Sequence, residues 1–526
     1  MYSPTDSGPV VPTDPLITFL ERLQLTALNT FGSKNYDPKH YVDLSLKHNL
    51  SETQLAFDDL PKSSTGSVSG VDLNGFITSY FNGAGEDLVY AELPDFVPEP
   101  EGFLPAVENP VVREWALEVH KLWKNLSRRV DAGVFEHPEL HTLLPLSKSV
   151  VVPGSRFREV YYWDSYWVIS QPPLLSAMVY AIYSRTGDMD FARKSLPALL
   201  KEHHFWNSGF HSVTILDAEG CNRTLSRYYA MWNKPRPESS TIDMGTASKL
   251  SSASEKQHLY RELASGAETG WDFSSRWMRF SVALQECFRS HDIGYNLNHP
   301  CGFKCIILQM ELNIAFLAKV TGDRITAARF LEAAEARKLA MNSVFWNEEM
   351  GQWLDYWISD KTTCKDDYTW VASNQNRNIF ASNFIPLSVE LFNSDLELVE
   401  KVRQSLQRSG LIRAVGIATS LTNSGQQWDF PNGWAPIQHL IVEGLVRSGS
   451  KEAKSLAKDI AARWIRTNYV FYKKTNTMSE KYDVEKCGEY GGGGEYVPQS
   501  GFGWSNGVVL AFLEEFGWPK DLKIDC

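Results

Sequence analysis

Apolar and polar positions along this chain are spaced in a way that predicts paired helices. In three places an apolar stretch ends at a glycine, a polar residue follows, and a second helical stretch runs into aromatic residues. The copies are residues 178–206 around Thr186-Gly187-Asp188, 310–346 around Thr321-Gly322-Asp323, and 437–472 around Ser448-Gly449-Ser450. Glycine suits the left-handed residue after a helix, and Asp or Ser can cap the next helix. Each copy therefore predicts an antiparallel helical hairpin.

Hairpins of this kind need neighbours that bury their apolar faces. An open solenoid would supply them, but a closed ring brings widely separated segments to one site more easily. We therefore predict an all-α fold, an α/α toroid ((α/α)6 barrel). Long irregular stretches lie between the helices, and long loops in a compact protein are usually functional, so the chemistry should lie at their common end. These stretches are residues 152–166, 231–271, 347–378, 426–436 and 482–503.

Length and composition suit a single large catalytic unit. The chain has 526 residues, of which 43% are hydrophobic and 17 are tryptophan, which is enough for a substantial core. We predict a polar, proline-rich tail over residues 1–15 and one domain over 16–526. The net charge of -11, without a basic run, argues against a nucleic-acid surface or a polybasic membrane anchor. A neutral or polar small-molecule substrate fits better.

Signals for the cellular compartment are sparse. No segment approaches the ~18 consecutive apolar residues of a membrane span, and the first residues lack the basic start and apolar core of a signal peptide. Three sequons, at Asn49, Asn125 and Asn222, would matter only in a secretory compartment, and so few can also arise by chance. The seven cysteines are odd in number and scattered, so we predict neither a disulfide framework nor a paired zinc site.

The stretch QWDFPNGWAP, residues 427–436, is rich in aromatic and rigid residues. Tryptophan faces can cover the apolar C–H faces of a pyranose, and Asp429 could accept hydrogen bonds from its hydroxyls. Proline and glycine limit the conformations that are lost on binding. The stretch therefore predicts a sugar-binding wall that includes Trp428. The alternative for any single one of these tryptophans is a buried aromatic turn, because tryptophan is mostly a core residue.

Acidic residues in aromatic loops suggest glycosidic bond cleavage. That reaction needs one protonated carboxyl that delivers a proton to the leaving oxygen, and a second carboxylate that activates water or attacks the sugar. Asp272 lies between Trp271 and Phe273, and apolar surroundings favour the protonated form. The alternative role for Asp272 is the N-cap of a helix over residues 273–284. The four glycines at 491–494 either allow close backbone approach to a ligand or form a flexible loop.

Three segments together resemble the trehalases of glycoside hydrolase family 37. They are residues 156–166, the stretch 427–436 and the run that ends at Glu495, and their flanks are similar to the plant members. The resemblance covers almost the whole chain from about Pro15 onward. It implies an α/α toroid that hydrolyses α,α-trehalose to two glucoses with inversion, without a metal or cofactor. It also implies an extracellular or plasma-membrane-associated protein, because family members often act there.

The resemblance also assigns roles by motif. It implies that Asp272 is the general acid and that Glu480 is the base that activates water. The residues that would hold the sugars are Arg156, Trp163, Asp164, Ser170, Gln171, Arg236, Glu238, Gly270 and Glu495. Arginine is apt because its fixed donors can bridge hydroxyls and keep a base ionised. In an inverting enzyme the two carboxyl groups should lie ~6.5 to 9.5 Å apart, which leaves room for water.

The chain departs from the family pattern in two places. Ile169 leads directly into Ser170-Gln171-Pro172-Pro173, where the family has roughly forty more residues, about two helices, with a sugar-binding Asn and an Arg that have no counterpart here. Residues 299–305 replace a segment that supplies an Asp and an Asn, and the new Cys301 and Cys305 fit a locally shifted reading frame or divergence better than a metal pair. An alternative transcript or an imperfect gene model is our hypothesis for both departures.

Three functions follow from these observations. The leading one is an inverting trehalase. Its rival is a catalytically impaired trehalase-like protein that binds sugar, because a missing helix pair would open or distort the toroid. A different α/α-toroid glycosidase comes third.

Overall fold

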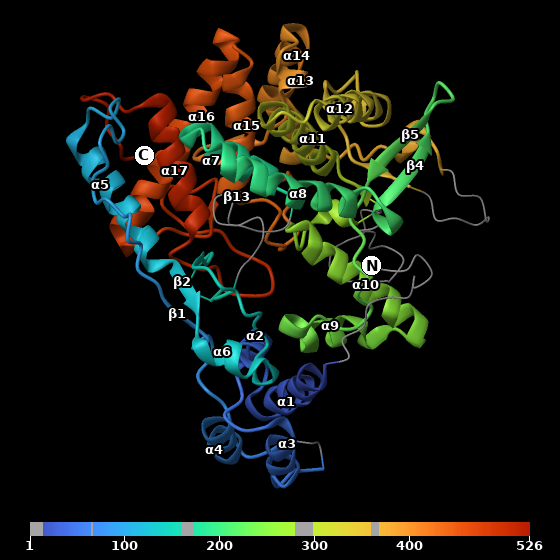
Figure 1. The fold of residues 1–526 in the computed structure, drawn as a ribbon, viewed down its shortest axis with the longest axis vertical. Helices are drawn as coiled ribbons and strands as arrows, with labels where there is room; N and C mark the ends of the chain where they lie inside the picture. Colours follow the sequence, from blue (N-terminus) through green and yellow to red (C-terminus); the bar gives the residue numbers. More distant parts are fainter. Residues whose placement is uncertain (1–13, 65–66, 155, 160–171, 279–297, 359–367) are drawn as a thin grey trace.

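The structure is a computed structural model that describes residues 14–64, 67–154, 156–159, 172–278, 298–358 and 368–526. Helices dominate it, and most of them lie in neighbouring pairs in the upper part of the molecule (Figure 1). A smaller unit, the N-terminal unit (residues 15–81), lies below them and carries helices α1 to α4.

All three predicted hairpins are present. In each, a glycine with positive φ lies between the helices, and an Asp or Ser side chain caps the second helix. The pairs are α7 (Leu175–Thr186) with α8 (Met189–Trp206), α11 (Cys301–Thr321) with α12 (Arg324–Val344), and α15 (Ala435–Arg447) with α16 (Lys451–Thr475). Local capping chemistry therefore fixes the turns as the sequence predicts.

Neighbouring helices pack in an order that follows the ring. α8 packs on α11, which packs on η9 (Ala381–Ser388), and η9 packs on α15. α15 and α16 then pack on α17 (Gly503–Phe516), which contacts α5 (Pro110–Lys121). The α/α toroid is thus confirmed. An exposed ion pair of 3.1 Å between Arg185 and Glu514 joins α7 to α17, and a pair of that kind stabilises little.

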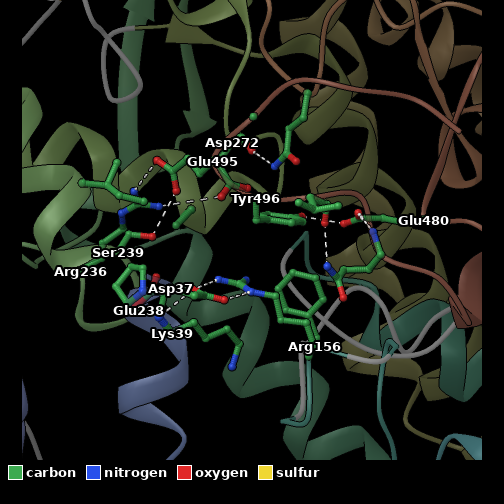
Figure 2. Close-up of a pocket in the computed structure, with 18 of the residues that line it drawn as sticks. Asp37, Lys39, Arg156, Arg236, Glu238, Ser239, Asp272, Glu480, Glu495 and Tyr496 are labelled. Atoms are coloured by element: carbon green, nitrogen blue, oxygen red, sulfur yellow. Dashed lines mark hydrogen bonds and ion pairs between the residues drawn. The ribbon is translucent and has the colours of Figure 1, made fainter. Parts of the chain in front are cut away.

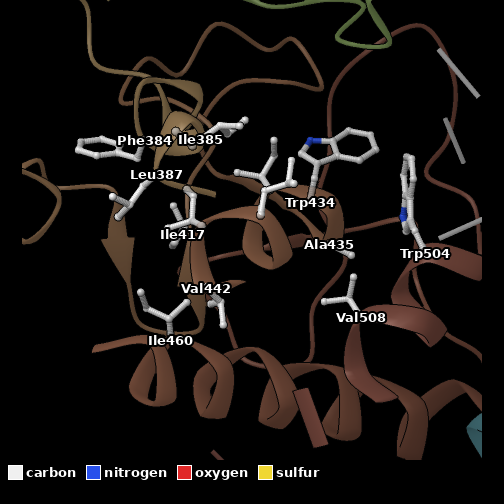
Figure 3. Packing of buried hydrophobic residues seen from close by; sticks show 14 of the residues in the cluster. Phe384, Ile385, Leu387, Ile417, Trp434, Ala435, Val442, Ile460, Trp504 and Val508 are labelled. Atoms are coloured by element: carbon white, nitrogen blue, oxygen red, sulfur yellow. The ribbon is translucent and has the colours of Figure 1, made fainter. Parts of the chain in front are cut away.

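The main apolar core lies between the toroid helices (Figure 3). Ile417, Trp434 and Val442 are at most 2% exposed there. α11 is so apolar that its best 18-residue window has a mean hydropathy of 1.5, enough by length and composition for a membrane span, but 78% of that window is buried inside the fold. Among the described residues, α11 is therefore a helix of the protein core, which explains its apolar composition.

The other helices vary in length, and the strands are short. The remaining helices are α1 (Pro15–Phe31), α2 (Pro38–Val42), α3 (Leu50–Asp58), α4 (Gly70–Tyr80), α6 (Ala132–Glu136), α9 (Ser240–Thr246), α10 (Ala253–Thr269), α13 (Glu390–Asn393) and α14 (Leu396–Arg408). The sheets are β1 (Leu88–Tyr90), β2 (Ser127–Val130) and β3 (Val150–Val151); β4 (Ser212–Leu216), β5 (Asn222–Ser226) and β10 (Tyr368–Thr369); and the pairs β6 (Asn298–His299) with β9 (Tyr356–Trp357), β7 (Trp346–Asn347) with β8 (Gln352–Trp353), β11 (Ile412–Arg413) with β12 (Gly416–Ile417), and β13 (Asn432–Trp434) with β14 (Lys481–Asp483).

The prediction that residues 231–271 are irregular was wrong, because α9 and α10 lie there. α10 starts at a capping box in which the Ser252 hydroxyl and the Glu255 carboxylate each accept a hydrogen bond from the other's backbone amide. Leu259 and Leu263 bury its apolar face. The sequence carries the signal for this start, because Ser-x-x-Glu is the pattern of a capping box.

The N-terminal unit packs against the toroid beside α9. It has its own apolar cluster, in which Phe19 and Leu73 are fully buried. Gln24 of α1 donates from Nε2 to the carbonyl oxygens of Pro38 at 2.9 Å and Pro237 at 2.8 Å. This amide therefore ties the turn at the start of α2 to residues of the toroid, so that residues 36–39 reach the central cavity.

The cysteine prediction was also wrong in part. Cys487 and Cys526 form a disulfide with a Cα–Cα distance of 6.3 Å, which ties the C-terminus to the loop after β14. Only the fold decides whether two distant cysteines come within bonding range, so their spacing gave no signal. Cys301 and Cys305 are buried in α11, where their thiols lie 3.2 Å from the Trp353 carbonyl oxygen and 3.6 Å from that of Ile385.

Candidate active site

A cavity of about 850 Å³ opens where the toroid loops meet the N-terminal unit. Segments far apart in the chain form its walls, with lining residues in the ranges 33–39, 236–242, 267–272, 427–434 and 480–504 and at positions 153, 156 and 157. Figure 2 shows that their charged side chains converge on this space. Four of the five predicted stretches therefore meet at one cavity, whereas no described residue of the stretch 347–378 lines it.

Asp272 is placed at the cavity by the end of α10. Gly270 ends that helix in the left-handed conformation, with φ 70°, and Thr269 Oγ1 accepts a hydrogen bond of 2.9 Å from the Trp271 amide. The Asp272 side chain lines the cavity and is 31% exposed. It does not cap the next turn, η7 (Ser275–Trp277), because Ser274 accepts the capping bond. In the described residues no helix starts at Phe273, so Asp272 caps none there, and residues 279–284 of the alternative helix lie outside the described residues.

The surroundings of Asp272 favour its protonated form. Burial raises its pKa to about 7, and the negative charges of Glu495 and Glu238 act in the same direction. The Arg236 guanidinium lowers the pKa, but Nη1 lies 4.0 Å from the nearest Asp272 oxygen and its charge is shared with other carboxylates. Near neutral pH a large share of Asp272 therefore carries the proton that a general acid must deliver.

Arg236 organises the acidic groups beside Asp272. Its Nε and Nη2 donate to the two oxygens of buried Asp243 at 3.0 and 2.7 Å, and Nη2 also donates to Glu495 Oε1 at 3.2 Å. The other Glu495 oxygen accepts from Ser239 Oγ at 3.1 Å. Glu238 and Gly270 line the same cavity. The structure thus brings together the predicted sugar-binding residues Arg236, Glu238, Gly270 and Glu495.

Glu480 lies on the side of the cavity opposite Arg236 (Figure 2). It directly precedes β14 and is 1% exposed. Its Oε1 accepts a hydrogen bond from the Tyr496 hydroxyl at 2.6 Å, and its Oε2 accepts one from the backbone amide of Gln499 at 3.1 Å. Burial raises the pKa of Glu480, while Lys481, these two hydrogen bonds and Arg156 lower it. A carboxylate whose charge is supported in this way can act as a base.

Arg156 is held by a residue that sequence reasoning missed. Its Nε and Nη2 donate to the two oxygens of Asp37, at 2.8 and 2.6 Å, and its guanidinium lies 4.9 Å from the Tyr496 ring centre. Asp37 comes from the N-terminal unit and caps α2. In the sequence, Asp37 before Pro38 reads only as a helix start, so nothing marked it as part of a site.

A family model described as Trehalase matches residues 33–170 and 169–517. The chain belongs to the trehalase family. It is 53% identical to a trehalase of Arabidopsis thaliana, over 99% of this chain and 89% of the relative. It is 52% identical to a probable trehalase of Oryza sativa subsp. japonica, over 99% of both chains. It is 33% identical to a trehalase of Homo sapiens, over 91% of this chain and 86% of the relative.

Among solved structures, the neutral trehalase Nth1 of Saccharomyces cerevisiae has a similar fold. The TM-score is 0.58 at 20% identity, over 78% of this chain and 94% of that chain. The alignment with the Arabidopsis trehalase spans 565 positions, which exceeds the 526 residues of this chain, so this chain lacks residues that the relative has. The match to the trehalase family model is interrupted at residues 169–170, at the departure that follows Ile169.

Four residues that the trehalase resemblance singles out cannot be placed. Trp163, Asp164, Ser170 and Gln171 lie outside the described residues. Of the remaining predicted site residues, each lines the cavity: Asp272, Glu480, Arg156, Arg236, Glu238, Gly270 and Glu495.

The prediction that residues 427–436 form a sugar-binding wall needs correction within the trehalase site. Trp428 lines the cavity but is 2% exposed, and its ring stacks on Trp271 at 5.0 Å and on Trp434 at 4.0 Å. Asp429 is fully buried and accepts hydrogen bonds from several serines, among them Ser274 and Ser420. The tryptophan faces and the carboxylate are therefore used to build the wall rather than to contact a sugar.

The glycine run 491–494 packs against the protein chain. A Cβ on Gly491 would lie 2.2 Å from Asn432 Oδ1, and a Cβ on Gly493 would lie 2.2 Å from the Gly425 carbonyl oxygen. Gly493 and Gly494 also line the cavity. Gly491 and Gly493 are therefore needed because the backbone passes close to other parts of the same chain, namely Asn432 of β13 and Gly425.

Proposed function

We propose that this chain hydrolyses α,α-trehalose to two glucose molecules with inversion of configuration. The observation that carries the proposal is the pairing, in one cavity, of Asp272, whose pKa is about 7, with Glu480, whose carboxylate accepts two hydrogen bonds. Membership of the trehalase family supports the substrate.

The proposed reaction uses one proton transfer at each side of the sugar. Asp272 gives its proton to the glycosidic oxygen, so that the bond from that oxygen to the anomeric carbon breaks. A water molecule attacks the same carbon from the opposite face and gives a proton to Glu480. One glucose leaves with the α configuration and the other forms with β. Proton exchange with solvent then recharges Asp272 and frees Glu480.

Arg236 and Glu495 suit the positioning of the sugars. A guanidinium and carboxylates that are already ordered by one another offer fixed donors and acceptors to hydroxyls, so that little freedom is lost on binding. Asp243 keeps Arg236 in place from behind the cavity wall. The proposal also requires that the carboxyl groups of Asp272 and Glu480 lie ~6.5 to 9.5 Å apart, because the attacking water needs that room.

An extracellular or plasma-membrane-associated location is part of the same proposal. The disulfide between Cys487 and Cys526 supports it, because disulfides persist in oxidising compartments. The sequon residues Asn49, Asn125 and Asn222 are exposed, which makes them accessible to glycosylation. Treatment of protein purified from its native tissue with an N-glycosidase should then raise its mobility on a gel, and unchanged mobility would contradict glycosylation.

The proposal is tested with purified protein and trehalose. Glucose release should be measured, and the anomers that form first should be followed by NMR. Equal early amounts of α- and β-glucose support inversion, whereas α-glucose alone would contradict it. Asp272→Asn and Glu480→Gln should each abolish turnover while the fold is kept.

The catalytically impaired alternative is tested in the same experiment. A second version carries the residues of the Arabidopsis relative inserted between Ile169 and Ser170. If only this version releases glucose, while the chain as it stands binds trehalose without turnover, the catalytically impaired alternative is correct. Faster hydrolysis of another disaccharide would favour a different glycosidase of the same fold.

A further inference from the structure

A buried base presents an electrostatic problem at this site. Glu480 must be ionised to accept a proton from water, yet it is 1% exposed and burial raises its pKa. An ionised carboxylate in such a place needs donors that act on its charged form. The question is which side chain supplies this support and also fixes the orientation of the carboxylate.

We propose that Tyr496 is the positioning residue of Glu480, and that Asp37 holds it in place through Arg156. This inference rests on the proposed role of Glu480 as the base. The Tyr496 hydroxyl donates to Glu480 Oε1 at 2.6 Å, as Figure 2 shows. A hydroxyl bond to a carboxylate at this distance is among the stronger hydrogen bonds in proteins.

Tyr496 can act only as a donor in this pair. Burial and the neighbouring charge of Glu480 raise the pKa of its hydroxyl well above 10, so the hydroxyl keeps its proton throughout the working pH range. The other oxygen, Glu480 Oε2, accepts a hydrogen bond of 3.1 Å from the backbone amide of Gln499. With one donor on each oxygen the carboxylate plane is fixed, and each oxygen keeps a free lone pair for the proton from water.

The tyrosine ring is itself clamped from several sides. The Arg156 guanidinium lies 4.9 Å from the ring centre, and Phe157 meets the ring edge to face at 5.3 Å. Asp37 fixes the guanidinium with two hydrogen bonds of 2.8 and 2.6 Å. A chain of contacts therefore runs from the N-terminal unit through Asp37 and Arg156 to Tyr496 and the base.

This chain of contacts gives the N-terminal unit a role in catalysis. Asp37 is bound on its own side by the Lys39 amide, which donates to Oδ1 at 3.1 Å, so the start of α2 sets its position. A shift of that unit would move Arg156 and release the Tyr496 ring. The base would then lose orientation as well as a donor, which affects the chemical step, and the displaced Arg156 would also affect the binding of sugar.

The test compares Tyr496→Phe with the starting chain. Phenylalanine keeps the ring and its packing and removes only the hydroxyl. The variant should lose about ten- to hundredfold in kcat, with KM changed less than about threefold, because the interaction serves the reaction rather than binding. The acidic limb of kcat/KM should move upward by about one pH unit, since a donor to the charged form lowers the pKa of a base.

A second readout keeps the proposal testable whatever the activity. The infrared carboxyl band of Glu480 is isolated as the difference from Glu480→Gln, and its titration midpoint is measured in each protein. Tyr496→Phe should raise that midpoint by about one pH unit. If the chain releases no glucose from trehalose, the proposed function fails, but the midpoint still decides whether Tyr496 supports the carboxylate.

Two further variants complete the design. Tyr490→Phe is the matched control, because Tyr490 is exposed and outside this cavity, and it should leave kcat and the midpoint unchanged. Asp37→Asn should shift both in the same direction as Tyr496→Phe but less, and the double variant should fall short of the sum. An unchanged midpoint in Tyr496→Phe, or kcat within twofold, would overturn the proposal.

Discussion

Replacement of Asp272, the proposed general acid, should make the protein more stable while it removes activity. Asp272→Asn keeps the shape of a protonated carboxyl but cannot ionise. In the folded chain the pKa of Asp272 is about 7, whereas an unfolded aspartate titrates near pH ~4. Because the folded pKa is the higher one, the unfolded state loses its proton first as the pH rises. The ionisable group therefore lowers stability progressively between about pH 4 and pH 7.

The size of the effect follows from the difference between the two pKa values. About three pH units at ~1.4 kcal/mol each give an upper limit of about 4 kcal/mol. The side chain is 31% exposed to the cavity, so water screens part of the penalty, and we expect about 2 kcal/mol above pH 7. For a chain of this length the variant should then melt about 2 °C higher, because the unfolding entropy grows with chain length.

The assay is thermal unfolding of the variant and the starting chain at a series of pH values. The difference in Tm should be close to zero at pH 4, rise up to about pH 7 and stay constant above it. Asp95→Asn, at an exposed residue outside the cavity, is the matched control and should show no such trend. A Tm difference that is the same at pH 4 and pH 8, or that falls with rising pH, would refute the reasoning.

Three further predictions concern the surroundings of the site. Glu495→Gln removes a charge that raises the pKa of Asp272, so the alkaline limb of kcat/KM should move to lower pH; an upward move would contradict the assignment. Cys526→Ser opens a disulfide that spans 39 residues and should lower the free energy of unfolding by about 4 kcal/mol, seen as a Tm that no longer responds to reductant. Gly433→Ala would place a Cβ 2.4 Å from a side-chain carbon and 2.9 Å from a carbonyl oxygen, so it should cost about 3 kcal/mol; Gly492→Ala, whose Cβ would meet nothing within 4 Å, should be neutral by the same melting assay.

Local signals were enough for the helical hairpins. A glycine followed by a capping residue, as in Gly187-Asp188, acts within one turn of the chain, so the sequence alone predicts it. The same kind of signal at Ser252 and Glu255 marks α10. The start of α10 is therefore also a local feature that the sequence can predict, without any effect of tertiary structure.

The use of the conspicuous aromatic segment needed the tertiary structure. Trp428 and Asp429 have the residue types of a sugar-binding wall, but stacking on Trp271 and Trp434 and a set of serine hydroxyls occupy them. Residue type tells which contacts a side chain can make. Which contact it makes depends on the segments that the fold places beside it.

The sequence by itself determined the helical class and the family, and through the family motifs it gives the proposed acid and base. These depend on local periodicity and on short motifs, which stay readable without the fold. Only the tertiary structure decided the pairing of Cys487 with Cys526, the placement of Glu495 and Glu238 where their charges raise the pKa of Asp272, and the support of Glu480 by Tyr496. Disulfide geometry, desolvation and hydrogen bonding act over a few ångströms in space, between segments whose separation along the chain carries no record of their contact.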